Sequence, residues 1–286
     1  MNNRFNCPNC DKVNGRVNKL NSRMLDLMHT DYRVYDCSCG MKFLWPRVED
    51  GDLEKLYNGD YFGDSSFQAT PENYLDTVKS RHVKFTECLE KLRQYLKVSD
   101  LRLSHINFLD IGAGTGDMVN LALKAGYNAQ GLEFSEYARM KAKENFGIEL
   151  LDYSISELPE GQFDVIHTNH VFEHFNDPNR ELRLINRALK NDGLFYVEIP
   201  RQFHIIEIFK YILGLDKIKY NLHSIHHPFF YSESLLCKIL IKGSFEILES
   251  RTITRINKRW SFKYIFWKLL GMLGIGNIIE VYAVKK

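Results

Sequence analysis

The chain has 286 residues, of which 44% are hydrophobic and 26% are charged, and its formal net charge is +2. This composition predicts a folded core and excludes wholesale disorder. The net charge gives no argument for nucleic acid binding, which usually needs a concentrated basic surface. The length allows one large α/β domain together with a small module.

Residues 1–10 are polar and contain two cysteines, so we expect no secretory signal. The most apolar stretch, residues 260–279, is interrupted by Lys263 and Lys268. It falls short of the roughly 20 apolar residues that a membrane-spanning helix needs. We therefore predict a cytoplasmic protein without a transmembrane segment.

Residues 1–50 are predicted to form a small zinc-ribbon-like module that carries two close pairs of cysteines. Short strands are expected over residues 32–35 and 41–45. Paired cysteines on turns joined by short strands favour a structural metal, which replaces a core that so small a module cannot build. A reducing compartment favours metal over disulfides, although a ribbon without metal is the alternative. The expected ligands of a structural Zn²⁺ are Cys7, Cys10, Cys37 and Cys39.

Residues 51–100 are predicted to form a helical connector that packs on the main domain. Apolar positions recur there at alternating spacings of three and four, which places them on one face of a long helix. Pro71 lies near the start of that helix, where proline is favoured. The residues of the expected face are Leu75, Val78, His82, Phe85, Leu89, Leu92 and Leu96.

Residues 101–286 alternate between strand and helix patterns, which predicts parallel strands with crossover helices. The strands are expected over residues 106–111, 129–134, 148–151, 163–168, 194–199, 245–249 and 278–284. The helices are expected over residues 117–125, 135–146 and 178–190. We predict an α/β fold with a Rossmann-like, mostly parallel seven-stranded sheet flanked by helices. An insertion or lid, rich in aromatic residues and histidines, is expected over residues 201–243.

A glycine-rich turn follows the first expected strand of this domain and opens a helix. Gly112, Gly114 and Gly116 allow a tight turn and a close approach of the backbone to a ligand. The dinucleotide fingerprint would need a further glycine at position 117, which is Asp117 here. The spacing therefore argues against NAD.

Two acidic residues add to this signal. Glu133 ends the next strand, where a carboxylate can accept hydrogen bonds from both ribose hydroxyls of a nucleoside. Asp110 precedes the glycines, where its charge would repel a pyrophosphate but suits a ligand with a sulfonium and an ammonium group. Together they favour S-adenosylmethionine as the cofactor.

Residues 108–116, Glu133 and residues 164–174 resemble the class I S-adenosylmethionine-dependent methyltransferases. Upstream, residues 37–46 and the pairs Leu56-Tyr57 and Tyr61-Phe62 are similar to a subgroup with an N-terminal zinc-binding segment. That subgroup includes sugar C-methyltransferases and methyltransferases of surface polysaccharides or secondary metabolites. The chain departs from it in the second cysteine pair, which is C-x-C and leaves Asp36 at one of the usual ligand positions.

The resemblance implies a role for each matching residue. The implied cofactor-binding residues are Asp110, Gly112, Gly114, Gly116, Glu133, Asp152 and Asn169. Among them Glu133 would hold the ribose, Asp152 would lie on the adenine side, and Asn169 would lie beside the methyl donor. Tyr57 and Tyr61 would close over the cofactor.

Methyl transfer needs a nucleophile aligned with the methyl group and, for an oxygen or carbon nucleophile, a nearby general base. Histidine is the usual base near neutral pH. The predicted catalytic residues are His170, Glu173, His174 and His226. Residues 173 and 174 match a Glu-His pair of the family, with fixation of the loop as the alternative role. His226 or His227 would reach the acceptor from the lid, and His167 is expected to face the sheet.

We predict a methyltransferase for a sugar or related polar metabolite, in surface-polysaccharide or secondary-metabolite biosynthesis. The aromatic and histidine-bearing insertion suits sugar rings. The expected partner is therefore a small-molecule or glycan acceptor, and no nucleic acid is expected. One alternative is an O-methyltransferase of a small aromatic or quinone-like acceptor. A non-catalytic alternative is a nucleic-acid-binding protein that uses the cysteine ribbon and the basic residues Arg251, Arg255, Lys258, Arg259 and Lys263.

Overall fold

The computed structural model describes residues 6–7, 9–12, 16–17, 25–27, 30–46, 71–98, 100–201, 227–253 and 276–286. Tyr57, Tyr61 and His226 lie outside these residues, so their predicted roles stay predictions. Within the described ranges, no helix is long and apolar enough to cross a membrane.

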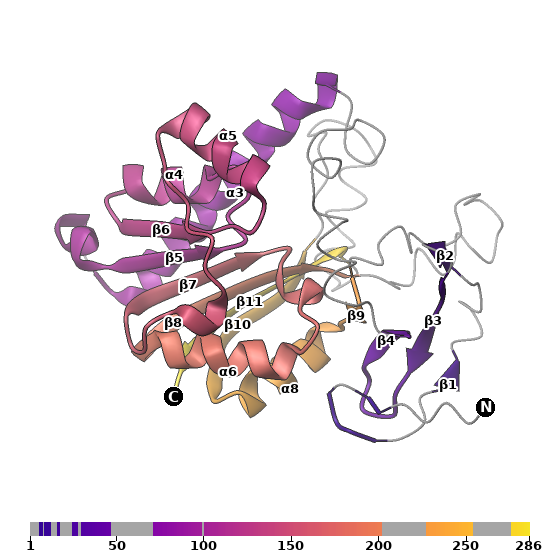
Figure 1. Ribbon diagram of the computed structural model, residues 1–286. Helices are drawn as coiled ribbons and strands as arrows, with labels where there is room; N and C mark the ends of the chain where they lie inside the picture. Colours follow the sequence, from indigo (N-terminus) through magenta and orange to yellow (C-terminus); the bar gives the residue numbers. More distant parts are fainter. Residues whose placement is uncertain are drawn as a thin grey trace.

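A mixed β-sheet forms the centre of the main domain (Figure 1). Its described strands are β5 (Asn107–Ile111), β6 (Asn128–Leu132), β7 (Phe163–Asn169), β8 (Leu189–Pro200), β10 (Phe245–Ile253) and β11 (Ile278–Lys285). They follow the order β10-β11-β8-β7-β5-β6. Strands β5 to β8 pair in parallel, whereas β11 runs antiparallel between β8 and β10. The predicted α/β class is confirmed, with a mixed central sheet flanked by helices.

The prediction of seven strands is wrong, because the described sheet has six. The segment expected as a strand over residues 148–151 makes a single parallel bridge, between Leu151 and Leu132. Two backbone hydrogen bonds of 2.9 Å hold Leu151, one to Gly131 and one from Glu133. The segment is too short for a ladder, because it starts just after the left-handed Gly147 that ends the preceding helix.

Helices cover both faces of the sheet (Figure 1). They are α3 (Pro71–Leu96), α4 (Asp117–Lys124), α5 (Glu136–Phe146), α6 (Pro178–Ala188) and α8 (Glu233–Lys242). Side chains alternate between the two faces along each strand. Phe108 and Val165 thus pack with α3 and α4, whereas Leu109 and Ile166 pack with α6 and α8.

Capping side chains mark where several of these helices begin. The hydroxyls of Ser135 and Ser232 accept backbone N–H bonds at the starts of α5 and α8, and Asp177 caps α6. Such caps satisfy N–H groups that have no partner within the helix. Helix α8 lies in the last part of the stretch expected as an insertion, and it buries its apolar face on the sheet. Residues 202–226 lie outside the described part, so the lid stays a prediction.

Among residues 81–96 of helix α3, whose burial the structure describes, His82 departs from the predicted face. Phe85, Leu89 and Leu92 are buried as expected, but His82 is exposed. Lys84 is buried instead. The helix is therefore rotated so that Lys84 faces the sheet, where its partner Glu198 lies on β8.

A second, antiparallel sheet is built mainly from the N-terminal module. Its strands are β1 (Arg16–Val17), β2 (Leu25–Leu27), β3 (Thr30–Asp36), β4 (Lys42–Trp45) and β9 (Phe229–Phe230). Strand β9 comes from the main domain and pairs with β4, where Phe43 lies opposite Phe229. Met41 and Phe43 belong to the same core cluster as Phe172. The module thus shares its core with the main domain.

Candidate active site

The glycine-rich turn lies where the parallel strands β5 and β6 end, and the structure shows why glycine is needed there. Gly112, Gly114 and Gly116 all have positive φ angles, of 69°, 54° and 81°. Side chains other than glycine are strained in this conformation. At Gly112 an added Cβ would also lie 2.3 Å from a methyl carbon of Val171. The turn thus leaves backbone uncovered at the carboxyl end of the sheet, where such folds bind ligands.

Glu133 lies at the end of β6 and contacts this turn directly. Its carboxylate accepts a 2.7 Å hydrogen bond from the backbone N–H of Gly114 and a 2.8 Å bond from that of Ser135. Burial raises the pKa of Glu133, although these two hydrogen bonds oppose the shift. A carboxylate has about four acceptor positions, so two remain for a ligand with two hydroxyls.

Asp110 is a buried residue of β5, two positions before Gly112. Its Oδ1 is 2.6 Å from Nδ1 of His167, which is fully buried and stacks on Tyr196. His167 therefore lies on the face of the sheet that α3 covers, where it contacts Phe85. A position on a face of the sheet is what the alternation of residues along the strand predicts. One oxygen of Asp110 is held by this pair, so its carboxylate is oriented before any ligand binds.

Asp152 and two aromatic residues lie at the outer side of β6. The side chain of Asp152 is 68% exposed and lies 3.8 Å from the guanidinium of Arg139. Phe134 and Tyr153, which directly follow Glu133 and Asp152, are 62% and 52% exposed. Exposed aromatic rings beside two acidic residues offer a flat apolar surface to a planar ring.

Asn169 lies at the end of β7 and accepts a hydrogen bond from the ammonium of Lys84. Lys84 also forms an ion pair with Glu198, whose side chain is fully buried on β8. The hydroxyl of Tyr196 donates to the same carboxylate at 2.9 Å. Sequence reasoning missed Lys84; its only signal is its position one helical turn before the buried Cys88.

His170 follows Asn169 in a left-handed conformation, with φ of 56°. Such a conformation is costly for histidine and is common at functional sites. Its ring nitrogens lie 3.5 Å from Glu173 and 3.4 Å from Glu198. Burial lowers the pKa of His170, but the two carboxylates outweigh this effect and raise the pKa to about 9. The raised pKa favours the protonated form of His170, and its role as a general base stays a prediction.

Glu173, His174 and His227 lie together beside His170. The carboxylate of Glu173 is 1% exposed, and within the described part of the chain neither of its oxygens has a hydrogen-bond partner. Its Oε1 lies 3.9 Å from Nε2 of His174 and 3.8 Å from Nε2 of His227. Burial opposes ionisation of Glu173, but the surrounding histidines lower its pKa. The predicted Glu-His pair is thus joined by His227, the neighbour of the predicted His226.

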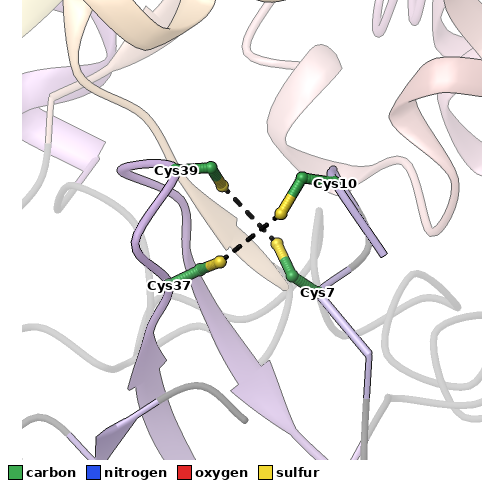
Figure 2. Close-up of side chains that lie close together, drawn as sticks. All are labelled: Cys7, Cys10, Cys37 and Cys39. Atoms are coloured by element: carbon green, nitrogen blue, oxygen red, sulfur yellow. Dashed lines mark hydrogen bonds between the residues drawn. The ribbon is translucent and has the colours of Figure 1, made fainter. Parts of the chain in front are cut away.

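The four N-terminal cysteines come together at two facing turns (Figure 2). The Sγ atoms of Cys7 and Cys39 are 3.7 Å apart, and those of Cys10 and Cys37 are 3.6 Å apart. All four sulfur atoms lie within 4.8 Å of one another. These distances are far longer than the roughly 2.05 Å of a disulfide. The cysteines are therefore free thiols that face one common point.

Comparisons with known proteins agree with this geometry. A family model described as a methyltransferase domain matches residues 81–250, which is more than half of the chain. An uncharacterized methyltransferase of Bacillus cereus is 28% identical over 132 residues, which are 44% of this chain and 61% of that protein. A ubiquinone biosynthesis O-methyltransferase of Pelagibacter ubique is 27% identical over 163 residues, 52% of this chain and 64% of that protein. The chain thus spans less than two thirds of either relative.

Solved structures show the same fold at low sequence identity. Magnesium protoporphyrin IX methyltransferase from Synechocystis, solved with S-adenosylhomocysteine, is 14% identical with a TM-score of 0.53. That likeness covers 82% of this chain and 94% of the other. A Haloferax volcanii methyltransferase, solved in complex with its activator, is also 14% identical, with a TM-score of 0.50 and coverage of 74% and 97%.

Proposed function

We propose that this chain, which belongs to the methyltransferase-domain family, transfers a methyl group from S-adenosylmethionine to a hydroxyl-bearing acceptor. The observation that carries the proposal is the contact between Glu133 and the turn at Gly114. It puts a carboxylate beside bare glycine backbone at the carboxyl ends of two parallel strands. A nucleoside with a free diol and a compact charged tail fits this arrangement better than a dinucleotide does.

In this proposal each part of the cofactor has a place along the sheet edge. The two free acceptor positions of Glu133 would take the ribose hydroxyls. The exposed faces of Phe134 and Tyr153 would cover the adenine, with Asp152 at its edge. The glycine turn and the oriented Asp110 would hold the amino-acid end. Asn169, at the end of β7, would then lie beside the reactive methyl group.

The reaction itself asks the protein mainly for alignment. The acceptor oxygen attacks the methyl carbon, the bond from that carbon to sulfur breaks, and the hydroxyl proton is lost. The histidines near the end of β7 lie where an acceptor would meet the methyl group. His174 and His226 are proposed to orient the acceptor, with Glu173 fixing His174.

A sugar or a related polar metabolite remains our first choice of acceptor class. The three polar side chains of His170, His174 and His227, which lie close together, support a hydroxyl-rich acceptor. A small phenolic acceptor is the second candidate, because the Pelagibacter relative is named as a ubiquinone biosynthesis O-methyltransferase. Radiolabelled S-adenosylmethionine distinguishes the two classes when it is offered with nucleotide-linked sugars and with catechols in parallel. Label that enters catechols alone would overturn the first choice, and label that enters sugars would support it.

We also propose that Cys7, Cys10, Cys37 and Cys39 bind a structural Zn²⁺. Zinc lies about 2.3 Å from each thiolate in a tetrahedral site, so neighbouring sulfur atoms should be about 3.8 Å apart. The observed 3.6 and 3.7 Å support this fit. Four thiolates leave no position for a substrate, so the ion would hold the two turns together. Cobalt substitution tests it: a thiolate-to-metal absorption band is expected, and its persistence in Cys10→Ser would contradict the assignment.

A further inference from the structure

The carboxylate of Glu173 is buried beside three imidazoles, and the nearest of them, His170 at 3.5 Å, makes no hydrogen bond to it. It is almost completely buried, and neither oxygen accepts a hydrogen bond from any described group. A buried carboxylate without such bonds is strongly unfavourable unless a cation lies beside it. Ring nitrogens of His170, His174 and His227 lie 3.5 to 3.9 Å from Oε1.

These distances are too long for direct hydrogen bonds, which would lie at about 2.7–3.2 Å. They suit ligands that share one ion. With metal-to-ligand distances of about 2.0–2.2 Å, two ligand atoms of a tetrahedral site are about 3.3–3.6 Å apart. The ligand atoms of Glu173, His174 and His227 all lie within 4.8 Å of one another. Small shifts of the rings of His174 and His227 would bring their distances to Glu173 into this range.

The three side chains are held by different parts of the fold. Glu173 and His174 lie on the short turn Phe172–His174 after β7, fixed by a 2.9 Å bond from the N–H of His174 to Val171. His227 lies just before β9, whose pairing with β4 joins it to the N-terminal module. A 2.9 Å bond from the N–H of Leu44 to Pro228 strengthens that link. The cluster is therefore preorganised by two independent backbone contacts.

We propose that Glu173, His174 and His227 bind a divalent metal ion of the zinc type and that an open position on this ion takes a hydroxyl of the acceptor. Two imidazoles and one carboxylate are a common ligand set for catalytic zinc, and three protein ligands leave the fourth position free. The buried Glu173 closes one side of the ion. His174 and His227 keep about one sixth of their surface exposed, at 16% and 17%, so the open position faces solvent.

This inference rests on the proposed function and narrows its acceptor to a molecule with a free hydroxyl beside the methyl donor. Bound to the ion, that hydroxyl loses its proton to solvent more readily. Its oxygen then forms the bond to the methyl carbon while the bond from carbon to sulfur breaks. The products are a methyl ether, S-adenosylhomocysteine and one proton, so no further reactant is needed.

Metal analysis of the purified full chain tests the proposal. After equilibration with Zn²⁺ and removal of loose ions, His174→Ala and His227→Ala should each hold about one equivalent less zinc than the wild type. His105→Ala, an exposed histidine outside the cluster, is the matched control and should hold the same amount as the wild type. Zinc contents of both cluster variants equal to the wild type would overturn the proposal. The cysteine site is the same in all of these proteins, so zinc bound there does not change the difference in zinc content between variant and wild type.

Glu173→Gln provides a second variant that keeps the shape of the side chain. It should also lose about one equivalent of zinc, and its turnover should fall while its affinity for S-adenosylhomocysteine stays within about twofold of the wild type. Retained zinc in this variant would count against Glu173 as a ligand. The cofactor titration separates the two ideas: a wild type that binds S-adenosylhomocysteine but shows no zinc difference refutes the metal site alone. A wild type that binds no S-adenosylhomocysteine refutes the proposed function itself.

Discussion

The carboxylate of Glu133 accepts a 2.7 Å hydrogen bond from the backbone N–H of Gly114, which joins the end of β6 to the glycine turn after β5. The two features that suggest a nucleoside site in the sequence are thus in direct contact. A second N–H bond, from Ser135, holds the other carboxylate oxygen. The site is therefore organised before the cofactor arrives, at the cost of burying a charge.

That buried charge predicts a pH-dependent stability. Burial raises the pKa of Glu133 in the folded protein, so the folded state holds this proton more tightly than the unfolded state does. Its contribution to stability is present below the unfolded pKa and is lost as pH rises through the folded pKa. Urea unfolding should show that Glu133→Gln gains free energy of unfolding, relative to the wild type, as pH rises from the ordinary pKa of a glutamate, about 4.3, through the raised pKa of the folded protein. A relative loss over that interval would contradict the assignment.

The glycine turn offers a matched pair of substitutions. Gly112→Ala should lower the free energy of unfolding by about 2–4 kcal/mol, because left-handed strain adds to a clash with Val171. Gly114→Ala should lose only the strain, about 1–2 kcal/mol, since nothing lies within 4 Å of the added carbon. Val171→Ala should rescue the first variant and not the second. Equal losses for both variants, measured by urea unfolding, would show that Val171 does not crowd the turn.

The exposed aromatic rings of Phe134 and Tyr153 are expected to cover the adenine of the cofactor. Phe134→Ala should weaken binding of S-adenosylhomocysteine about threefold to tenfold, as expected for loss of one aromatic contact. Stability should change little, because the ring is 62% exposed. Ile241→Ala, at an exposed apolar position on α8, is the control. Calorimetric affinities that are unchanged for Phe134→Ala would move the adenine elsewhere.

The buried ion pair of Lys84 and Glu198 predicts a large structural effect. Lys84→Met removes the ammonium that pairs with the buried carboxylate of Glu198, which should cost about 3–5 kcal/mol in the free energy of unfolding. The double variant with Glu198→Gln should recover part of this loss. Lys91→Met, which breaks the more exposed pair with Glu249, should cost about 1 kcal/mol or less. Thermal or urea unfolding that ranks the two lysines equally would refute this account of α3.

The order of strands and helices could be predicted because its signals are local. A buried strand, a glycine turn and an amphipathic helix follow one another along the chain, and the pattern repeats. The positions of Gly112, Gly114 and Glu133 follow from that order alone. The bridge at Leu151 was beyond the same reasoning, because the number of ladder bonds that a four-residue segment makes depends on where α5 ends in space.

Contacts between distant segments could not be predicted in the same way. The pairing of Asp110 with His167 joins two strands, and the pairing of β4 with β9 joins the N-terminal module to the main domain. The inward rotation of Lys84 depends on a carboxylate more than a hundred residues away in sequence. The complete burial of Glu173 likewise depends on how the turn after β7 packs against the N-terminal module.

The most direct test of the central claim is calorimetric titration of the full chain with S-adenosylhomocysteine, repeated with NAD. The account predicts micromolar binding of the first and none of the second. Glu133→Ala should weaken the first by about 1–3 kcal/mol, the cost of leaving hydroxyls unpaired, while the exposed Glu160→Ala should leave it unchanged. Binding of NAD, or an affinity for S-adenosylhomocysteine that does not depend on Glu133, would contradict the site described for this protein.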